Sequence, residues 1–299
     1  MSRKPNMPNM NRMQTRTISC SFAKDFKAPE SEKIRETFDG IAEKYDLANV
    51  LCSFGLSAYW TRSAARAVID SASCKTKQQK SCEKQPLKIL DLACGTGQVS
   101  YALASLGAKV VGSDFSEGML NKAKNRLNKK SAFERKSLKK MRYAPEFVCA
   151  NAENLPFEDN SFDAAVTAYG LRNMKNRIQA LKELKRVIKP GGTAVILDFD
   201  NPQNNFLRSL YRAYNRIVLP SAGMIIANNK EAYAYLAHSI STWGGRKEVC
   251  SLLHGAGFKQ IESRTETFGA VSICRAKAPE KTDDYCSNAN YHKRTGNKK

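Results

Sequence analysis

Apolar residues along the chain alternate between two spacings, short continuous runs and positions three or four apart. Such runs are typical of buried strands, and the wider spacing is typical of helices with one apolar face. The runs predict strands at 87–92, 108–114, 146–150, 162–168 and 193–199. The helical spacing falls between them, at 99–106, after Ser116 and at 178–189. Strands that alternate with helices predict an α/β fold with a parallel, doubly wound sheet.

Helix-end signals support two of these helices. Ser116 has the side chain of a helix N-cap, and Glu117 follows it in the positively polarised first turn. The helix at 178–189 is predicted to end at Pro190-Gly191-Gly192, because proline and glycine stop helices.

Two segments fall outside the alternation. Residues 31–51 have helical spacing and predict an N-terminal helical cap, followed by a polar stretch at 71–86. Residues 203–243 are rich in Tyr, Leu and Ile and predict a helical insertion. A helix near 246–256 follows it, and segments 258–264 and 268–273 are predicted to close the sheet as a hairpin.

Length and composition fit one soluble, globular domain. The 299 residues are 42% hydrophobic, which excludes a wholly disordered chain, and no apolar run reaches the ~20 residues of a membrane-spanning helix. We expect the domain at residues 31–275, between basic, disordered tails at 1–30 and 276–299. The nine cysteines form no C-x-x-C pair and the histidines number three, so we expect reduced thiols and no metal site.

Positive charge is concentrated in a few segments. The chain has 49 Lys+Arg against 28 Asp+Glu, a net charge of +21. The excess lies at 1–24, 71–88, 122–142 and 275–299. Two interpretations stay open: a solvated, lysine-rich surface, or attraction to a polyanion such as anionic lipid or nucleic acid.

Chemistry-bearing residues follow three of the predicted strands. Gly95, Thr96 and Gly97 follow the first, where glycines let a ligand approach the backbone and the next helix offers free N–H groups. A third glycine is missing, which argues against a dinucleotide. Asp114 ends the second strand, where a carboxylate can accept both hydroxyls of a ribose. Asn151-Ala152-Glu153 follows the third, where an amide and an N–H can contact adenine. Each has an ordinary structural alternative, but together they indicate an adenosyl ligand.

These residues carry a family resemblance. The segments 91–97, 114–120 and 151–157 resemble class I S-adenosylmethionine methyltransferases. Further segments resemble the ubiquinone/menaquinone biosynthesis C-methyltransferase family, namely 38–46, 170–173 (Gly-Leu-Arg-Asn), 184–192, 211–220 and 233–239. This second resemblance covers about residues 33–275 and implies a Rossmann-like, seven-stranded class I methyltransferase sheet with a helical cap and a helical lid insertion.

The resemblance also implies the cofactor site. S-adenosylmethionine would be held by Thr96, Asp114, Asn151 and Ala152, above a turn shaped by Gly95 and Gly97. Ala168 belongs to the same site, although the family often has a serine there. Gln98 replaces the usual aspartate, and segment 268–274 lacks the histidine that is common in the family. The segments 71–86 and 128–143 resemble insertions relative to typical members.

The reaction implied by the resemblance is methylation of a ring carbon of a prenylated hydroquinone. The main interpretation is conversion of demethylmenaquinol to menaquinol, and the alternative is methylation of 2-polyprenyl-6-methoxy-1,4-benzoquinol in ubiquinone biosynthesis. Because the methyl donor carries an excellent leaving group, alignment and exclusion of water can supply most of the catalysis without a metal. Arg172 and Asn173 are the first catalytic candidates, since a guanidinium can stabilise a ring oxyanion or polarise a water that accepts its proton.

Structural alternatives exist for both residues: Arg172 can pair with a carboxylate, and Asn173 can cap the next helix. Tyr45, Asp46 and His238 are secondary candidates. The cap and the 203–243 insertion are expected to form a lid with an apolar tunnel for the prenyl tail. The residues that would supply its surface are Phe206, Leu210, Tyr211, Tyr214, Ile217, Leu219, Met224, Ile225 and Ile226. The alternative is that they only form the core of the insertion.

The expected partners are a prenylated quinol and an anionic membrane surface. This predicts a cytoplasmic protein that is peripheral at the inner face of the cytoplasmic membrane. The acid-free N-terminal segment makes the mitochondrial matrix the alternative. RNA is the rival substrate because of the net charge, but Thr167-Ala168-Tyr169-Gly170 stands where base methylases have an Asn/Asp-Pro-Pro-aromatic turn, and no Pro-Cys pair exists. A non-catalytic binding module, a small-molecule O-methyltransferase and a homodimer stay open.

Overall fold

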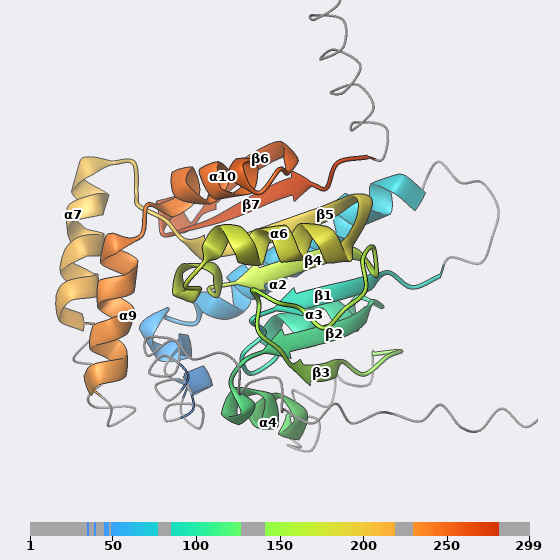
Figure 1. The fold of residues 1–299 in the computed structure, drawn as a ribbon. Coiled ribbons are helices and arrows are strands. Elements are labelled where there is room, and N and C mark those ends of the chain that lie inside the picture. Colours follow the sequence, from blue (N-terminus) through green and yellow to red (C-terminus); the bar gives the residue numbers. More distant parts are fainter. Residues whose placement is uncertain are drawn as a thin grey trace, which may run out of the picture.

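A seven-stranded sheet with helices on both faces forms the centre of the protein (Figure 1). The computed structural model describes Arg35, Asp39 and residues 45–47, 49–76, 85–126, 141–218 and 230–280. The strand order is β3-β2-β1-β4-β5-β7-β6, and all neighbouring strands are parallel except β7, which is antiparallel to β5 and β6. This confirms the doubly wound α/β sheet and the seven strands that the resemblance implies.

The strands lie close to where the apolar runs predict them. Their bounds are β1 (Lys88–Leu92), β2 (Lys109–Asp114), β3 (Glu146–Cys149), β4 (Phe162–Ala168), β5 (Ile188–Phe199), β6 (Lys259–Glu266) and β7 (Val271–Lys277). The predicted closing hairpin is confirmed as β6 and β7, with β7 inserted between β5 and β6.

The start of β5 corrects one prediction. Helix α6 (Arg177–Val187) ends before the proline, and the chain enters β5 at Ile188 rather than at 193. Phe162 of β4 pairs with Ile188, whereas Ala164 pairs with Thr193, so Pro190-Gly191-Gly192 forms an irregular bulge within the strand. Proline and glycine therefore interrupt the strand pairing here rather than end the helix.

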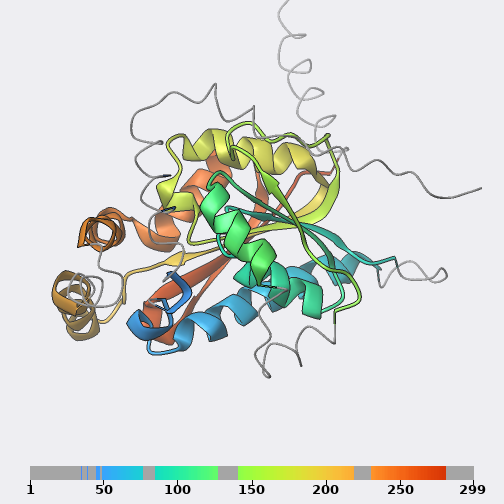
Figure 2. The same cartoon turned by 90° about the horizontal axis from the view of Figure 1, so that it is seen from below.

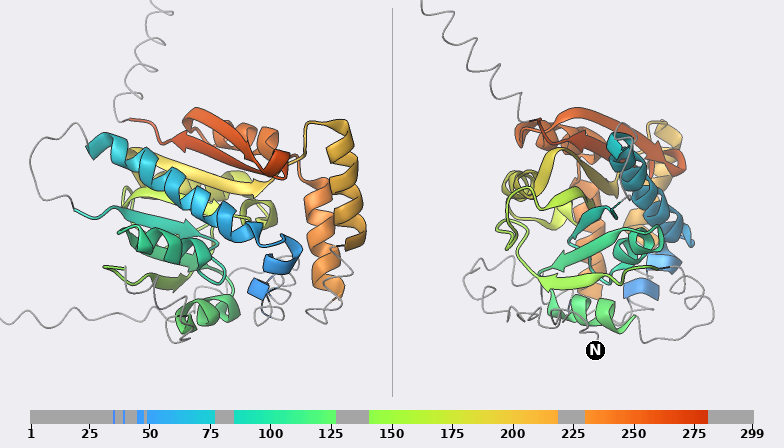
Figure 3. Two further views of the ribbon diagram at one scale, coloured as in Figure 1. Left: turned by 180° about the vertical axis from the view of Figure 1, so that it is seen from behind. Right: turned by 90° about the vertical axis from the view of Figure 1, so that its right-hand side faces the viewer.

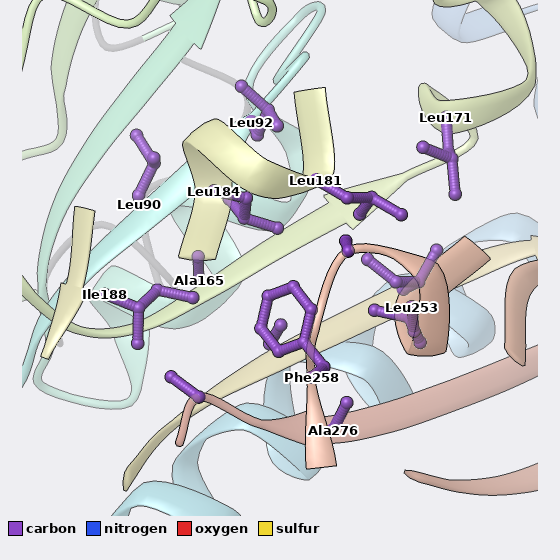
Figure 4. Close-up of a cluster of buried hydrophobic side chains, with 14 of the residues drawn as sticks. Leu90, Leu92, Ala165, Leu171, Leu181, Leu184, Ile188, Leu253, Phe258 and Ala276 are labelled. Atoms are coloured by element: carbon purple, nitrogen blue, oxygen red, sulfur yellow. The ribbon is translucent and has the colours of Figure 1, made fainter. Parts of the chain in front are cut away.

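The helices divide between the two faces of the sheet (Figure 2). Helices α6 and α10 (Gly245–Gly255) pack on one face, and α2 (Leu56–Thr76) and α3 (Gln98–Ser105) pack on the other. Figure 4 shows the first core, in which Phe258 lies among Leu184 of α6, Leu253 of α10, Ile188 and Ala276. Helix α4 (Glu117–Asn125) lies beside β3 and begins at the predicted N-cap, since Ser116 Oγ accepts a hydrogen bond from Met119 N at 3.0 Å.

Helix α2 is the element that the sequence analysis missed. It crosses one face of the sheet (Figure 3), and residues 71–76 belong to it rather than to the predicted polar stretch. Its buried side includes Trp60, Ala64, Ala65, Val68 and Ala72. Alanines at this spacing give a weak apolar signal, because a small side chain marks a close-packed face without forming an apolar stripe.

The helical insertion is confirmed where the structure describes it. It contains α7 (Asn205–Ala213), η3 (Tyr214–Val218) and α9 (Lys230–Thr242), and α7 stands beside α9 at one end of the sheet (Figures 1 and 3). Two short 3-10 turns, η2 (Leu171–Asn173) and η4 (Thr267–Gly269), lie at the same end. Leu219, Met224, Ile225 and Ile226 lie outside the described residues.

Several other predictions also lie outside the described residues. These are the tail at 1–30, the tail beyond 280, most of the cap at 31–44 and the stretches 77–84 and 127–140. Arg35, Asp39 and residues 45–47 of the cap are helical, as expected. Within the described part of the chain, no helix has the length and apolar character needed to cross a membrane.

Candidate functional site

A cavity opens at the carboxyl ends of β1, β4 and β5, where ligands bind in doubly wound sheets. The turn after β1 and the segment after β4 line the cavity on the side of the sheet. The cap, α7, η3 and α9 line the rest of it. The sequence-predicted site residues in its lining are Gly95, Thr96, Ala168, Arg172, Asn173 and the secondary candidate Tyr45. Gly97, Asp114, Asn151 and Ala152 lie at or after the carboxyl ends of β1, β2 and β3 but do not line this cavity.

The turn after β1 is held by the carboxylate of Asp114. Gly95 N donates to Asp114 Oδ2 at 2.8 Å, and Ser116 N donates to Asp114 Oδ1 at 3.0 Å. Each carboxylate oxygen keeps a lone pair for another donor. Burial raises the pKa of Asp114 to about 6. Gly95 has a φ of +55° with open space where a side chain would stand, so the turn leaves its backbone approachable from the cavity.

Asp46 connects the cap to this turn. Its Oδ1 accepts hydrogen bonds from Thr96 Oγ1 at 2.6 Å and from Gln98 Nε2 at 2.8 Å, and its Oδ2 pairs with Arg126 Nη1 at 3.0 Å. Gln98 thus supplies a donor where the usual aspartate would place a second carboxylate against Asp46. Both oxygens of the Asp46 carboxylate take part in these contacts, so its geometry is that of a link between two segments rather than a base.

The loop after β3 lies at the same edge of the sheet. Asp114 pairs with Cys149 across β2 and β3, which places Asn151 just beyond the end of this pairing. Asn151 Oδ1 accepts from Glu153 N at 2.9 Å, and Ala152 packs against the hydrophobic core. The turn is therefore held by its own hydrogen bond and by packing on the core. The adenine contacts predicted for Asn151 and Ala152 stay predictions.

Arg172 is buried beneath the cavity and paired with Asp198. Its Nη1 donates to Asp198 Oδ1 at 2.9 Å and to Tyr169 O at 2.6 Å, and the two side chains are 4% and 0% exposed. The guanidinium carbon lies 4.9 Å from the centre of the Phe199 ring. Arg172 thus makes the carboxylate pair proposed as its structural alternative, and it also lines the cavity with a buried Nε that has no hydrogen-bond partner among the described residues.

Asp198 is a functional candidate that the sequence analysis missed. Burial raises its pKa, and the positive charge of Arg172 opposes that rise. The sequence contains one signal that could have identified it, because Asp198 follows directly on the apolar run at 193–197 and a carboxylate buried in a strand requires a partner.

The structural alternative for Asn173, a helix cap, is wrong. Asn173 does not cap the following helix, because Asn176 Oδ1 accepts from Gln179 N at 3.0 Å and is the N-cap of α6. Asn173 instead accepts a hydrogen bond from Tyr235 OH of α9 at 3.2 Å. His238, also on α9, is exposed and does not line the cavity, so the structure gives it no place in this site.

Neutral phenols surround Arg172. Burial raises the pKa of Tyr45, Tyr169 and Tyr211, and it raises that of Tyr214 to about 12. At neutral pH these side chains are hydrogen-bonding groups rather than bases. Tyr211 and Tyr214 were expected in a tunnel and do line the cavity, whereas Tyr169 was not singled out from the sequence. Within the described residues, no group of three or more His, Cys, Asp or Glu could hold a metal ion.

Comparison with known proteins identifies the family. Residues 26–277 match the model of the ubiE/COQ5 methyltransferase family. The chain belongs to this family. Membership confirms the resemblance seen in the sequence, and with it a methyltransferase that uses S-adenosylmethionine.

Individual relatives are similar along most of their length. A demethylmenaquinone methyltransferase of Clavibacter sepedonicus is 38% identical over 247 residues, which cover 83% of this chain and 91% of the relative. A ubiquinone/menaquinone biosynthesis C-methyltransferase UbiE of Idiomarina loihiensis is 32% identical over 269 residues, 89% of this chain and 98% of the relative. The crystal structure of a SAM dependent methyltransferase from Aquifex aeolicus matches with a TM-score of 0.44 and 20% identity, over 69% of this chain and 89% of that chain.

Proposed function

We propose that this family member transfers a methyl group from S-adenosylmethionine to a ring carbon of demethylmenaquinol. The observation that carries the proposal is one cavity that joins the approachable glycine turn at Gly95 to the buried guanidinium of Arg172. The name of the Clavibacter sepedonicus relative supports this quinol as the acceptor. The name of the Idiomarina loihiensis relative supports the ubiquinone precursor as a second acceptor.

The residues at the glycine turn fit the methyl donor. S-adenosylmethionine, when bound, supplies an electrophilic methyl group on a sulfonium sulfur. Gly95 leaves open space at the turn, and the Asp114 carboxylate beside it has lone pairs free for two ribose hydroxyls. Thr96 reaches the cavity while its hydroxyl is oriented by Asp46. These residues would bind and orient the donor at the β1 end of the cavity.

Apolar side chains of the same cavity fit an aromatic quinol. Its walls include Trp60, Phe199, Leu236 and Ile240, which exclude water and pack against an apolar ring and tail. Within the part of the chain that the structure describes, Tyr169 OH and Ser57 Oγ are buried without a partner, and each can hydrogen-bond a ring oxygen. Excluding water here strengthens every electrostatic interaction with the ring.

Arg172 makes the ring carbon nucleophilic by favouring the ionised hydroxyl next to it. A buried positive charge lowers the free energy of a developing oxyanion, and the unpartnered Nε provides a donor. Asp198 and the carbonyl of Tyr169 hold the guanidinium in one orientation. Asp198 is therefore a positioning residue in this mechanism.

The test is incubation of the purified chain with labelled S-adenosylmethionine and each reduced quinone, followed by separation of the lipids. We expect Arg172→Ala to retain binding of S-adenosylmethionine and to lose about 100-fold or more in turnover. Because removing one member of a buried pair destabilises a fold, the second variant is Arg172→Met combined with Asp198→Asn, which removes both charges. Exposed Arg264→Ala is the control. Undiminished turnover in a folded Arg172 variant contradicts the role of Arg172.

We also propose a membrane partner and a location. The acceptor is a membrane lipid, and the net charge of +21 favours an anionic bilayer surface. The corresponding place is the inner face of the cytoplasmic membrane, with the mitochondrial matrix as the alternative. Flotation with vesicles of neutral or anionic lipid tests the partner, and failure to bind anionic vesicles at low salt contradicts it.

A further inference from the structure

Three segments around the cavity present one side to it and another side to solvent. In the first, residues 47–60, Asn49, Cys52, Ser53 and Ser57 line the cavity. In the second, α7 with η3, the lining residues are Tyr211, Tyr214 and Asn215, and in the third, residues 267–270, Ala270 lines it. The residues between these lining positions face away from the cavity, and many of them are large and apolar.

Exposed apolar side chains are concentrated on these three segments. Among the described residues, eleven large hydrophobic side chains are exposed, and ten of them lie here. The ten are Leu47, Val50, Leu51, Phe54, Leu56, Tyr59, Phe206, Leu210, Ile217 and Phe268. The eleventh, Leu106, follows α3 at the opposite edge of the sheet. Phe54, Phe206 and Phe268 are 79%, 76% and 84% exposed, values far from those of a packed core.

Direct contacts join the three segments into one rim. The rings of Phe54 and Tyr214 lie 6.0 Å apart, and Tyr214 OH donates to the carbonyl oxygen of Cys52. Tyr211 OH donates to Ala270 O at 3.3 Å, and Trp60 Nε1 donates to Thr267 Oγ1 at 2.8 Å. The exposed apolar residues therefore surround the same cavity rather than lying on separate faces. We call these ten residues the apolar rim.

The rim is positively charged along α7 and η3. Residues 201–218 contain Arg208, Arg212 and Arg216 and no acidic residue. Arg212 and Arg216 are exposed, on the flank of α7 and η3 next to the stripe formed by Phe206, Leu210 and Ile217. Two acids adjoin the rim and both are already paired: Glu266 accepts hydrogen bonds from Tyr59 OH and Ser63 Oγ, and Asp46 pairs with Arg126. An amphipathic helix with this combination is typical of segments that lie in the surface of an anionic bilayer.

We infer that the apolar rim is a docking surface for an anionic lipid bilayer, which brings the mouth of the cavity against the membrane. The inference rests on the proposed function, because a prenylated acceptor would then enter the cavity from the bilayer without crossing water. A bilayer fits better than a protein partner, since the rim encircles the route by which a lipid acceptor must arrive. The basic segments elsewhere in the chain add electrostatic attraction to the bilayer, but the rim sets the orientation of the protein on its surface.

The experiment measures binding of the full chain to phosphatidylcholine vesicles with and without phosphatidylglycerol. The test variant combines Phe206→Ser, Leu210→Ser and Phe268→Ser, none of which lines the cavity. We expect at least ~10-fold weaker partitioning into anionic vesicles, because three apolar side chains no longer enter the bilayer surface. The matched control is Leu106→Ser, which removes an exposed leucine outside the rim and leaves partitioning unchanged. Arg212→Gln and Arg216→Gln each reduce the dependence on phosphatidylglycerol about fivefold.

Methyl transfer to a short-chain quinol in solution is measured in parallel. The triple variant keeps this activity while losing activity toward a long-chain quinol in vesicles. The inference is overturned if the triple variant partitions into anionic vesicles as strongly as the wild-type chain. It is also overturned if the wild-type chain is a dimer that the triple variant dissociates without any change in lipid binding. If the wild-type chain binds vesicles through the rim but methylates no quinol in solution, the proposed function fails and the docking surface stands.

Discussion

Two buried aspartates beside the cavity decide how the site responds to pH. Asp91 and Asp114 are 1% and 7% exposed, and burial raises their pKa values to about 7 and about 6. Ser100 Oγ donates to Asp91 Oδ2 at 2.5 Å, and backbone N–H groups donate to Asp114. Both carboxyls therefore change their ionisation between pH 5 and pH 8, where the effect on binding and on stability can be measured.

Binding of S-adenosylmethionine is expected to weaken below about pH 6. A protonated Asp114 loses part of its capacity to accept ribose hydroxyls, and its pKa is about 6. Asp114→Asn should bind at least ~10-fold more weakly, with an affinity that varies less across this range, because only Asp91 of the two carboxyls still titrates. Isothermal titration calorimetry at pH 5 and pH 8 measures both effects. Exposed Asp70→Asn is the control, and an affinity that is equally pH-dependent in Asp114→Asn contradicts the assignment.

Asp91 is expected to make the folded state less stable as pH rises. Its pKa is about 7 in the folded protein and ~3.9 in an unfolded chain, so between these values the folded state binds more protons. The free energy of unfolding therefore falls as pH increases through this window. Asp91→Asn removes the titration and should gain at least ~1 kcal/mol relative to wild type between pH 5 and pH 8. Urea unfolding at both pH values measures it, and a constant difference refutes the expectation.

The two glycines that flank α3, Gly97 and Gly107, differ in what surrounds them. Gly97 has a φ of +77°, and an alanine Cβ there would lie 3.0 Å from Phe147 Cζ and 3.2 Å from Ala123 Cβ. Gly107, at the other end of α3, has a φ of +91°, and no atom lies within 4 Å of the place that an alanine Cβ would take. Backbone strain is thus shared by the two positions, whereas crowding occurs only at Gly97.

We expect both Gly97→Ala and Gly107→Ala to cost about 1–2 kcal/mol of stability through the left-handed backbone. Only Gly97→Ala should also weaken binding of S-adenosylmethionine, by about 10-fold or more, because α4 and Phe147 must shift beneath the turn. Thermal unfolding and calorimetric titration of the two variants separate the effects. Equal affinities in the two variants would show that crowding at Gly97 does not reach the site.

Elements were predictable where the pattern and the packing agree. All strands buried on both faces stand out as apolar runs, and Ser116 caps α4 as its side chain predicts. Helix α2 was missed because alanines mark its buried side. The first residues of β5 were missed because Pro190 and the glycines after it look like a helix end, and only their pairing with β4 reveals a bulged strand.

At the scale of the whole molecule, the cap is joined to the core through the ion pair of Asp46 and Arg126. These side chains are 25% and 26% exposed, and Arg126 Nη1 also donates to Thr96 O at 3.1 Å. A double-mutant cycle with Asp46→Asn and Arg126→Gln should give a coupling energy of about 0.5–1 kcal/mol. The measurement is urea unfolding of the four proteins.

The matched pair for this cycle is Asp159 and Arg186, in which Asp159 is 68% exposed. Its coupling energy should be smaller, because water screens an exposed pair more strongly. We also expect the two proteins that carry Asp46→Asn to bind S-adenosylmethionine more weakly than wild type, since a neutral amide accepts the Thr96 hydroxyl more weakly than the carboxylate does. Coupling at Asp46 no larger than at Asp159 would mean that the cap is held by other contacts.

The candidate site was predictable for the parts that are local in the chain. The glycine turn and Asp114 follow consecutive strands, so their meeting at one edge of a parallel sheet follows from the strand order alone. The partner of Arg172 was not predictable, because Asp198 is 26 positions away and meets it only through the pairing of β4 with β5. His238 has suitable chemistry and lies on the correct helix, but the rotation of α9 turns it to solvent.

The sequence by itself determined the family, the doubly wound sheet and the residues that follow each strand, because apolar periodicity and short motifs are local properties of a chain. Only the tertiary structure decided which charges neutralise each other, which tyrosines are buried and which apolar side chains stay exposed around the cavity. Those outcomes depend on how helices rotate and pack against the sheet. Distances between residues far apart in the chain exist only once the chain has folded.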